Sequence, residues 1–156
     1  MRFNLKEKPV SDPASIQRFN QSHQKLTELR TELDRQMNIL RESFKLEFTN
    51  ITKDFFAGVP DVTHVSWTQY TPYFMDGDAC EFSVNDIYFN EVEDEDYGDS
   101  ENGVDIDKLP SDQKELCNKL TALISENEDI MESVFGDHVR VVLTANGAEV
   151  TEYEHD

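Results

Sequence analysis

The feature that most constrains this fold is a run, residues 14–57, that contains neither glycine nor proline. Asp12 is a good helix cap and Pro13 suits a first helical turn, whereas Gly58 followed closely by proline is typical of a helix end. A continuous helix of about 44 residues would be roughly 66 Å long. Because that length exceeds the diameter of a small domain, the helix must pack on another long helix, fold back on itself or pair with a second copy.

Large apolar residues recur at seven-residue intervals along this segment. Two such sets, offset by four positions, are typical of a coiled-coil seam, although Arg30 and Glu47 interrupt it. We therefore expect a homodimer formed through this helix; the alternative is a helix that only covers a sheet within one subunit. The residues expected in the dimer seam are Leu26, Leu33, Met37, Leu40, Phe44 and Ile51.

Charge is distributed very unevenly along the chain. Fourteen Lys and Arg stand against 33 Asp and Glu, which gives a net charge of −19. Residues 1–60 carry a net +2, residues 61–110 carry −13 and residues 111–156 carry −8. Nucleic acids and anionic membranes are polyanions, so we expect no direct binding to either. Such a surface instead attracts a basic protein partner and raises its association rate.

The second part of the chain alternates strand and helix signals. Residues 62–74 and 79–90 are rich in β-branched and aromatic types and flank an Asp-Gly turn, which predicts a hairpin. An amphipathic helix is expected to begin at Ser111 and to end at Gly136. A second hairpin follows around Asn146-Gly147, the strongest short hairpin signal in the chain.

These elements predict an α+β fold with a long N-terminal helix, a second amphipathic helix and two β-hairpins that form a four-stranded antiparallel sheet. We expect residues 1–10 to be an N-terminal extension and residues 11–58 to be the long helix. Residues 59–156 then form an acidic α+β portion that contains an acidic loop at 91–110. That loop, EVEDEDYGDSENGVDIDKLP, is longer than ordinary connections, which favours either disorder or function.

Aromatic residues beside the acidic loop suggest an anchor for a partner. Trp and Tyr are frequent hot-spot residues at interfaces, and flanking carboxylates would suit a basic groove. The alternative is that the aromatic residues pack the hairpin against the helices. The residues expected to bind a partner are Trp67, Tyr70, Tyr73, Glu91, Glu93, Asp94, Glu95, Asp96, Asp99 and Glu101.

The sequence offers no candidate for catalysis, a metal or a cofactor. An EF-hand loop aligned on Gly98 would place Tyr97 and Val104 at ligand positions, so the calcium pattern fails. The four histidines do not have the spacing of zinc ligands, and we expect Cys80 and Cys117 to be ordinary thiols. Nucleophile-elbow and phosphate-binding glycine motifs are absent from the sequence. We therefore expect a protein that is not an enzyme and has no catalytic, metal or cofactor residues.

Residues 67–84, WTQYTPYFMDGDACEFSV, resemble a stretch found in small, largely uncharacterised acidic proteins of tailed bacteriophages. In size, acidity and lack of catalytic motifs the chain is also similar to phage-encoded inhibitors of host enzymes, a class that includes DNA mimics. The resemblance implies a partner in the host cell and identifies no activity.

The leading hypothesis is an acidic interaction protein that binds and inhibits a host enzyme through a basic surface or groove. Alternatives are a DNA mimic that blocks a nucleic-acid-binding protein, a structural or assembly oligomer, and a metal-dependent hydrolase. The sequence has no run of 18 apolar residues and its first ten residues lack the apolar core of a secretory signal. Together with the two unpaired cysteines, this predicts a cytoplasmic protein.

Overall fold

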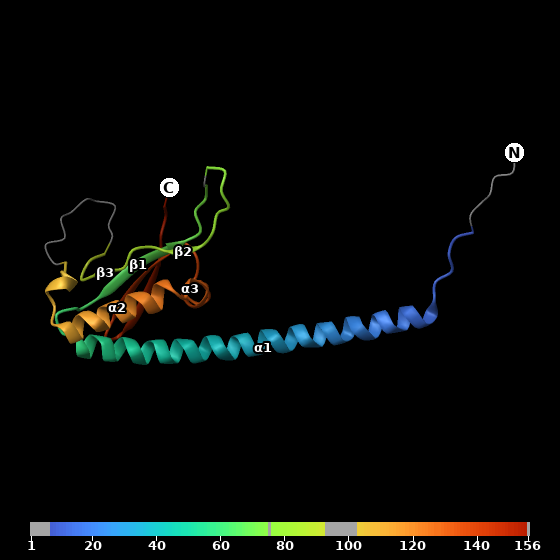
Figure 1. Ribbon diagram of the computed structural model, residues 1–156, viewed down its shortest axis with the longest axis horizontal. Helices are drawn as coiled ribbons and strands as arrows, with labels where there is room; N and C mark the ends of the chain where they lie inside the picture. Colours follow the sequence, from blue (N-terminus) through green and yellow to red (C-terminus); the bar gives the residue numbers. More distant parts are fainter. Residues whose placement is uncertain (1–6, 75, 93–102, 156) are drawn as a thin grey trace. The chain divides into compact units, whose positions relative to one another are not determined.

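The computed structural model describes residues 7–74, 76–92 and 103–155. The chain divides into two compact units, Met1–Leu40 and Arg41–Asp156. No helix within the described ranges is both long enough and apolar enough to cross a membrane. Figure 1 shows the elements along the chain, coloured from the N-terminus to the C-terminus.

Helix α1 (Pro13–Gly58) contains most of the described part of the first unit and the opening segment of the second. Asp12 caps it: the Ala14 amide donates to Asp12 Oδ1 over 3.1 Å, and the Ser15 hydroxyl donates to Oδ2 over 2.6 Å. The bond from Ser15 is also the main cause of a lowered pKa at Asp12. Both predicted ends of the helix are confirmed, and the helix is continuous between them.

In the first unit every described residue is exposed to solvent. Ion pairs run along the helix surface, from Arg30 to Asp34 and from Arg35 to Glu32, at distances of 3.2 and 2.6 Å. Exposed pairs of this kind contribute little to stability, because solvent screens them. The described part of the first unit therefore contains no core of its own.

The second unit is built on an antiparallel sheet. Its strands are β1 (Val65–Tyr70), β2 (Ser83–Val84), β3 (Tyr88–Phe89), β4 (Val139–Thr144) and β5 (Gly147–Glu152). The order is β2-β1-β4-β5, and β3 also pairs with β1. The α+β class predicted from the sequence is confirmed.

The predicted returning strand at residues 79–90 is formed only in part, as the two short strands β2 and β3. Val84 pairs with Gln69 and Tyr88 pairs with Ser66, so three residues of one strand face two of the other. Such a mismatch is a β-bulge, which bends the strand and interrupts its ladder. Asn85 occupies the bulge, where its amide and its side chain donate to the carbonyl and hydroxyl oxygens of Thr68.

The single helix predicted from Ser111 to Gly136 is divided into α2 (Ser111–Ser125) and α3 (Glu128–Phe135), and the short 3-10 helix η1 (Ile106–Lys108) precedes them. The break falls at Asn127, whose φ and ψ of −123° and 43° are not helical. Its side-chain amide donates to the Leu123 carbonyl, and its own carbonyl accepts from the Met131 amide. Asn127 thus ends one helix and begins the next, while Gly136 ends α3 with a φ of 99°.

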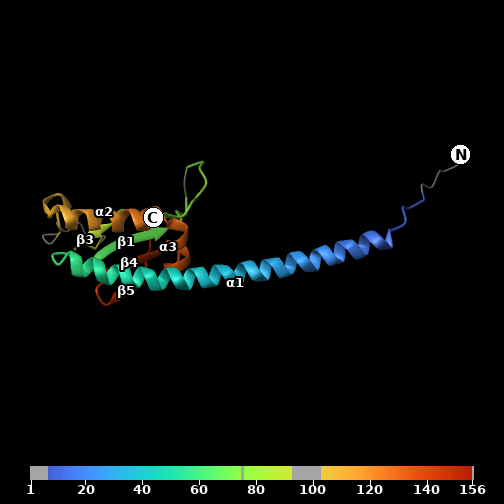
Figure 2. The same cartoon turned by 60° about the horizontal axis from the view of Figure 1, so that its bottom comes forward.

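Helices α2 and α3 and the last turns of α1 supply apolar side chains to one face of the sheet (Figures 1 and 2). Trp67 is central to this core: its ring meets that of Phe135 edge-on at 5.8 Å, and Phe135 in turn meets Phe48 of α1 at 5.8 Å. The core also includes Phe55, Val65, Cys117, Leu120, Ile124, Met131, Val141 and Leu143. The entire buried core belongs to the second unit.

Candidate partner-binding surface

Among the described residues of the second unit, the most exposed aromatic side chains lie between β1 and β2, in residues 71–82, which we call the Tyr73 loop. Tyr73 is 67% exposed and Phe74 is 80% exposed. Three exposed carboxylates, Asp76, Asp78 and Glu81, lie in the same loop. Gly77 has a φ of 83°, so the turn uses the left-handed conformation that glycine readily adopts. The loop therefore presents two aromatic rings among negative charges.

The first residue of the loop is held by Asp137. The Thr71 amide donates to Asp137 Oδ1 and the Thr71 hydroxyl donates to Oδ2, each over 2.7 Å, and the His138 amide donates to Oδ1 over 2.8 Å. Burial by itself raises the pKa of the Asp137 carboxyl. Together the hydrogen bonds lower this pKa by more than burial raises it, so it lies below its usual value. The loop therefore starts from a fixed position next to β4.

A stack of aromatic rings orients Tyr73. Its ring lies flat against His138 and His155, with centroid distances of 4.8 and 4.6 Å and planes within 10° of parallel. The two histidines are joined by a hydrogen bond of 2.9 Å between His138 Nδ1 and His155 Nε2. Tyr70 stacks on His155 at 3.6 Å. One face of Tyr73 is thus occupied by the histidines, while most of the side chain remains accessible.

Trp67 does not belong to this surface. Its side chain is only 1% exposed, and its indole N–H donates to the Gln69 side-chain oxygen over 2.9 Å. The expectation that Trp67 anchors a partner is therefore wrong, and the alternative of a packing role holds for it. Tyr70 is half-buried in the ring stack, which leaves Tyr73 as the exposed member of the three predicted aromatic residues.

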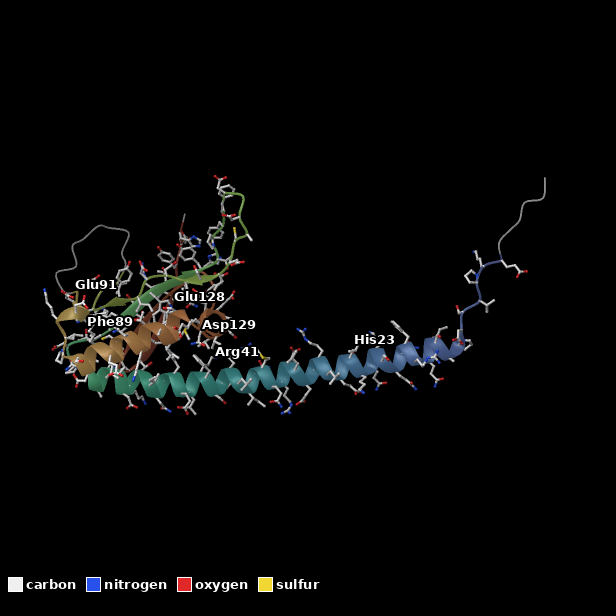
Figure 3. All side chains as sticks on the ribbon, viewed as in Figure 1. His23, Arg41, Phe89, Glu91, Glu128 and Asp129 are labelled. Carbon is white, nitrogen blue, oxygen red and sulfur yellow. The ribbon has the colours of Figure 1, made fainter. Side chains whose placement is uncertain are left out.

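Of the predicted acidic residues, the structure describes Glu91. It is half-buried (labelled in Figure 3), its carbonyl accepts a hydrogen bond from the Ser66 hydroxyl, and its side chain occupies the space that a side chain at Gly103 would need. Glu91 is thus in part a structural residue at the end of β3. The remaining predicted acids lie outside the described residues: Glu93, Asp94, Glu95, Asp96, Asp99 and Glu101.

The predicted dimer seam divides at the boundary between the two units. Leu26, Leu33, Met37 and Leu40 are each more than half exposed in the first unit. Phe44, in contrast, packs against the core of the second unit and stacks on Phe48. Phe44 is therefore part of the fold of its own chain, and the predicted seam continues past it only as the partly exposed Ile51.

An apolar groove of about 260 Å³ lies in the second unit where α1, α3 and the β4–β5 turn meet. Phe48, Phe135 and Leu143 contribute to its apolar lining, and Lys45 and Lys53 also border it. Within the described ranges, no three His, Cys, Asp or Glu side chains are grouped closely enough to hold a metal ion. The groove offers space for an apolar group but no visible catalytic constellation.

The two thiols differ sharply in accessibility, and we expect them to react differently. Cys80 is exposed in the Tyr73 loop, whereas Cys117 is buried on α2 and its pKa is raised by that burial. In the native protein, a chromogenic disulfide reagent should modify Cys80 within minutes and leave Cys117 unmodified until denaturant is added. Rapid modification of both thiols in the Cys80-containing protein, or of Cys117 in a Cys80→Ser variant, would contradict the packing of α2.

Two exposed surfaces therefore stand out, the Tyr73 loop in the second unit and the apolar side chains of α1 in the first. Both surfaces have the residue types of protein interfaces. In comparison with known proteins, the chain matches no family model, no curated protein and no solved structure.

Proposed function

We propose that the chain is a non-enzymatic acidic interaction protein that binds a basic surface or groove of another protein through the Tyr73 loop. The observation that carries this proposal is the exposed pair Tyr73 and Phe74, flanked by Asp76, Asp78 and Glu81. Large exposed aromatic side chains are unfavourable in water and become favourable when a partner covers them. The carboxylates select a partner that carries Lys and Arg around an apolar pocket.

The attachment of the loop supports a binding role. Thr71 is fixed by Asp137, and the Tyr73 ring is fixed by the two histidines. A side chain that is already ordered loses less conformational entropy on binding, so more of its contact energy appears as affinity. Phe74 is the more exposed of the two rings. Tyr73 thus acts as the fixed contact and Phe74 as the residue that enters a pocket.

Charge supports the same proposal. Residues 61–110, which include the whole Tyr73 loop, carry a net −13. A field of this sign accelerates encounters with a basic partner and makes the association rate fall as salt increases. The acidic residues at 93–101 contribute to this net charge.

The partner class follows from the resemblance of residues 67–84, which contain the Tyr73 loop, to proteins of tailed bacteriophages. On this basis the partner is a host enzyme, and binding inhibits it by occupying a basic groove. If that groove is a nucleic-acid site, the protein acts as a DNA mimic; if it is not, the blockade is of another kind. If duplex DNA displaces the protein from its partner, the groove is a nucleic-acid site; if it does not, the blockade is of the other kind.

The proposal predicts that Phe74→Ala weakens partner binding about 10- to 100-fold, the range expected for loss of an interface hot spot. The partner is first captured from host lysate at low salt and identified, and its affinity for purified variants is then measured by titration calorimetry. Leu46→Ala is the control, because it removes another large exposed apolar side chain, 62% exposed, from a different element of the second unit.

Charge is tested separately with Asp78→Lys. This substitution should reduce the affinity and flatten its dependence on salt, whereas Glu126→Lys, the same charge change at the end of α2, should have a smaller effect on both. An affinity that is insensitive to salt, to Asp78→Lys and to Phe74→Ala would show that the Tyr73 loop is not the binding surface.

A further inference from the structure

The first unit carries a continuous apolar stripe along α1 with no side chain of the described chain packed over it. The stripe consists of large residues that are each at least half exposed: Ile16, Phe19, Leu26, Leu29, Leu33, Met37 and Leu40. At about 100° per residue, those from Phe19 onward fall within an arc of roughly 80° on one helix face. Figure 3 shows side chains standing off α1 in the region around the labelled His23.

The spacing of the stripe follows a seven-residue period more closely than an eleven-residue one. Phe19, Leu26, Leu33 and Leu40 are each seven apart, whereas only two pairs within the stripe are eleven apart. A seven-residue apolar repeat drifts slowly around a helix of 3.6 residues per turn, so two such helices follow each other in a left-handed supercoil. The spacing is therefore that of a coiled-coil seam.

A helix with such a stripe needs a partner. Isolated helices are marginally stable in water, and most helical stability in proteins comes from packing of an apolar face. Contiguous apolar patches on a surface mark sites of association. Independently of the proposed function, we propose that the stripe is covered by the stripe of a second copy of this chain, with the two helices antiparallel.

Charge favours a second copy as the occupant. Residues 1–40 carry a net charge of only +2, whereas residues 41–156 carry −21. Basic partners are drawn to the acidic portion, and the first unit offers little attraction to a strongly charged protein of either sign. A copy of the same helix has matching length and a matching row of large apolar side chains. Ile16 to Leu40 spans just over three heptads, the minimum expected of a coiled-coil pairing.

The residues bordering the stripe favour the antiparallel orientation. In a parallel, in-register pair, Arg30 would lie against Arg30 of the second copy and His23 against His23. In an antiparallel pair centred on Glu28, Ile16 meets Leu40 of the second copy and Arg30 meets its Leu26. His23 likewise meets Leu33 of the second copy, so neither Arg30 nor His23 lies against its own counterpart and the Arg30–Arg30 repulsion of the parallel pair is absent.

Repulsion between the acidic portions of the two copies also favours the antiparallel orientation. Parallel helices would bring Arg41 of both copies, and the −21 portion that follows each, to one end of the pair. In the antiparallel register, the two Arg41 residues are separated by about 39 Å along the helix axis. That distance is several times the Debye length of about 8 Å at physiological ionic strength, so the repulsion is largely screened.

Sedimentation equilibrium of matched variants tests the pairing. Wild-type protein should sediment at twice the mass of the chain, and Leu33→Glu should raise the dimer dissociation constant at least 100-fold. Ile39→Glu makes a similar change on the opposite face of the same helix and should leave the dimer intact. Protection of Cys117 from thiol reagents, measured on each variant, verifies that the second unit remains folded.

Spin-label distances test the orientation. Single labels at Gln17→Cys or Thr31→Cys, in a Cys80→Ser background, should give clearly different separations between copies. The antiparallel register places the two Gln17 sites about 33 Å apart along the axis and the two Thr31 sites about 9 Å apart. Equal separations at both sites would mean a parallel pair and would overturn the orientation. A monomer at 100 μM, a larger oligomer, or a Leu33→Glu protein that still dimerises would overturn the pairing itself.

Discussion

Replacing Gln69 by leucine is expected to lower the free energy of unfolding of the second unit by about 3 kcal/mol, because it removes three hydrogen bonds made by a buried side chain. Gln69 is completely buried in β1. Its side-chain oxygen accepts from the Trp67 indole N–H over 2.9 Å, and its side-chain amide donates to the carbonyls of Met131 and Gly136 over 3.0 and 2.7 Å.

The size of the effect follows from the hydrogen bonds that a leucine side chain cannot make. A buried donor or acceptor that loses its partner costs roughly 1–3 kcal/mol, and the extra apolar burial of leucine offsets only part of that. Two of the three lost bonds go to the carbonyls of Met131 in α3 and of Gly136 at its C-terminal end, so Gln69 connects the sheet to α3 and to the turn that precedes β4. The loss therefore acts on the position of α3 as well as on β1.

Urea denaturation followed by tryptophan fluorescence measures this prediction directly, since Trp67 is the only tryptophan and lies in the affected core. The midpoint should fall while the slope stays the same, which separates lost stability from a change in compactness. Gln24→Leu, on the exposed part of α1, is the matched control and should leave the midpoint unchanged. An unchanged midpoint for Gln69→Leu would show that water replaces the lost contacts.

The parts of the fold that the sequence predicts are those fixed by local chemistry. Asp12 and Gly58 set the two ends of α1, and the Asn-Gly signal places the β4–β5 hairpin. Even there the turn is displaced by one position: Thr144 pairs with Gly147, so Ala145 and Asn146 form the two-residue loop. The displacement leaves Gly147 with a φ of 133°, where glycine is favoured.

Other features depend on contacts between distant residues, and local patterns do not contain them. Asn90 has a φ of 60° because its side chain accepts from the Thr63 amide and donates to the Asp61 carbonyl, which joins both ends of the first hairpin. The break between α2 and α3 depends on Asn127 bonding back to Leu123. Apolar periodicity continues through that break, so periodicity alone predicts one helix there.

At the candidate site, too, local signals predict some features, whereas others depend on contacts between distant residues. Tyr73 was predicted and is exposed, but Trp67 is buried, because composition does not reveal which face of a strand meets the helices. The contact between His138 and His155 is not predicted by any local pattern, because the two residues are 17 positions apart in the sequence. They meet because Tyr153, at the end of β5, bonds back to the His138 carbonyl and brings the last residues of the chain beside Tyr73.

Two phenylalanines on one helix should respond very differently to substitution by alanine. Phe48 is 6% exposed and contacts the ring of Phe135, whereas Phe19 is 69% exposed on the apolar stripe. Phe48→Ala is expected to lower the free energy of unfolding by about 3–5 kcal/mol, the usual cost of deleting a buried aromatic side chain. Phe19→Ala should change the stability of a dilute monomer by less than about 0.5 kcal/mol.

The assay that distinguishes them combines urea denaturation at low protein concentration with sedimentation at high concentration. Phe48→Ala should shift the Trp67 fluorescence midpoint at every concentration, because it acts within one chain. Phe19→Ala should shift it only where the dimer is populated, because a ligand of the folded state stabilises that state by mass action and here the ligand is a second copy. Equal shifts for both variants in dilute solution would mean that Phe19 is buried within its own chain. The opposite behaviour of two identical side chains would show that one helix supplies both the core of the second unit and the contact between copies.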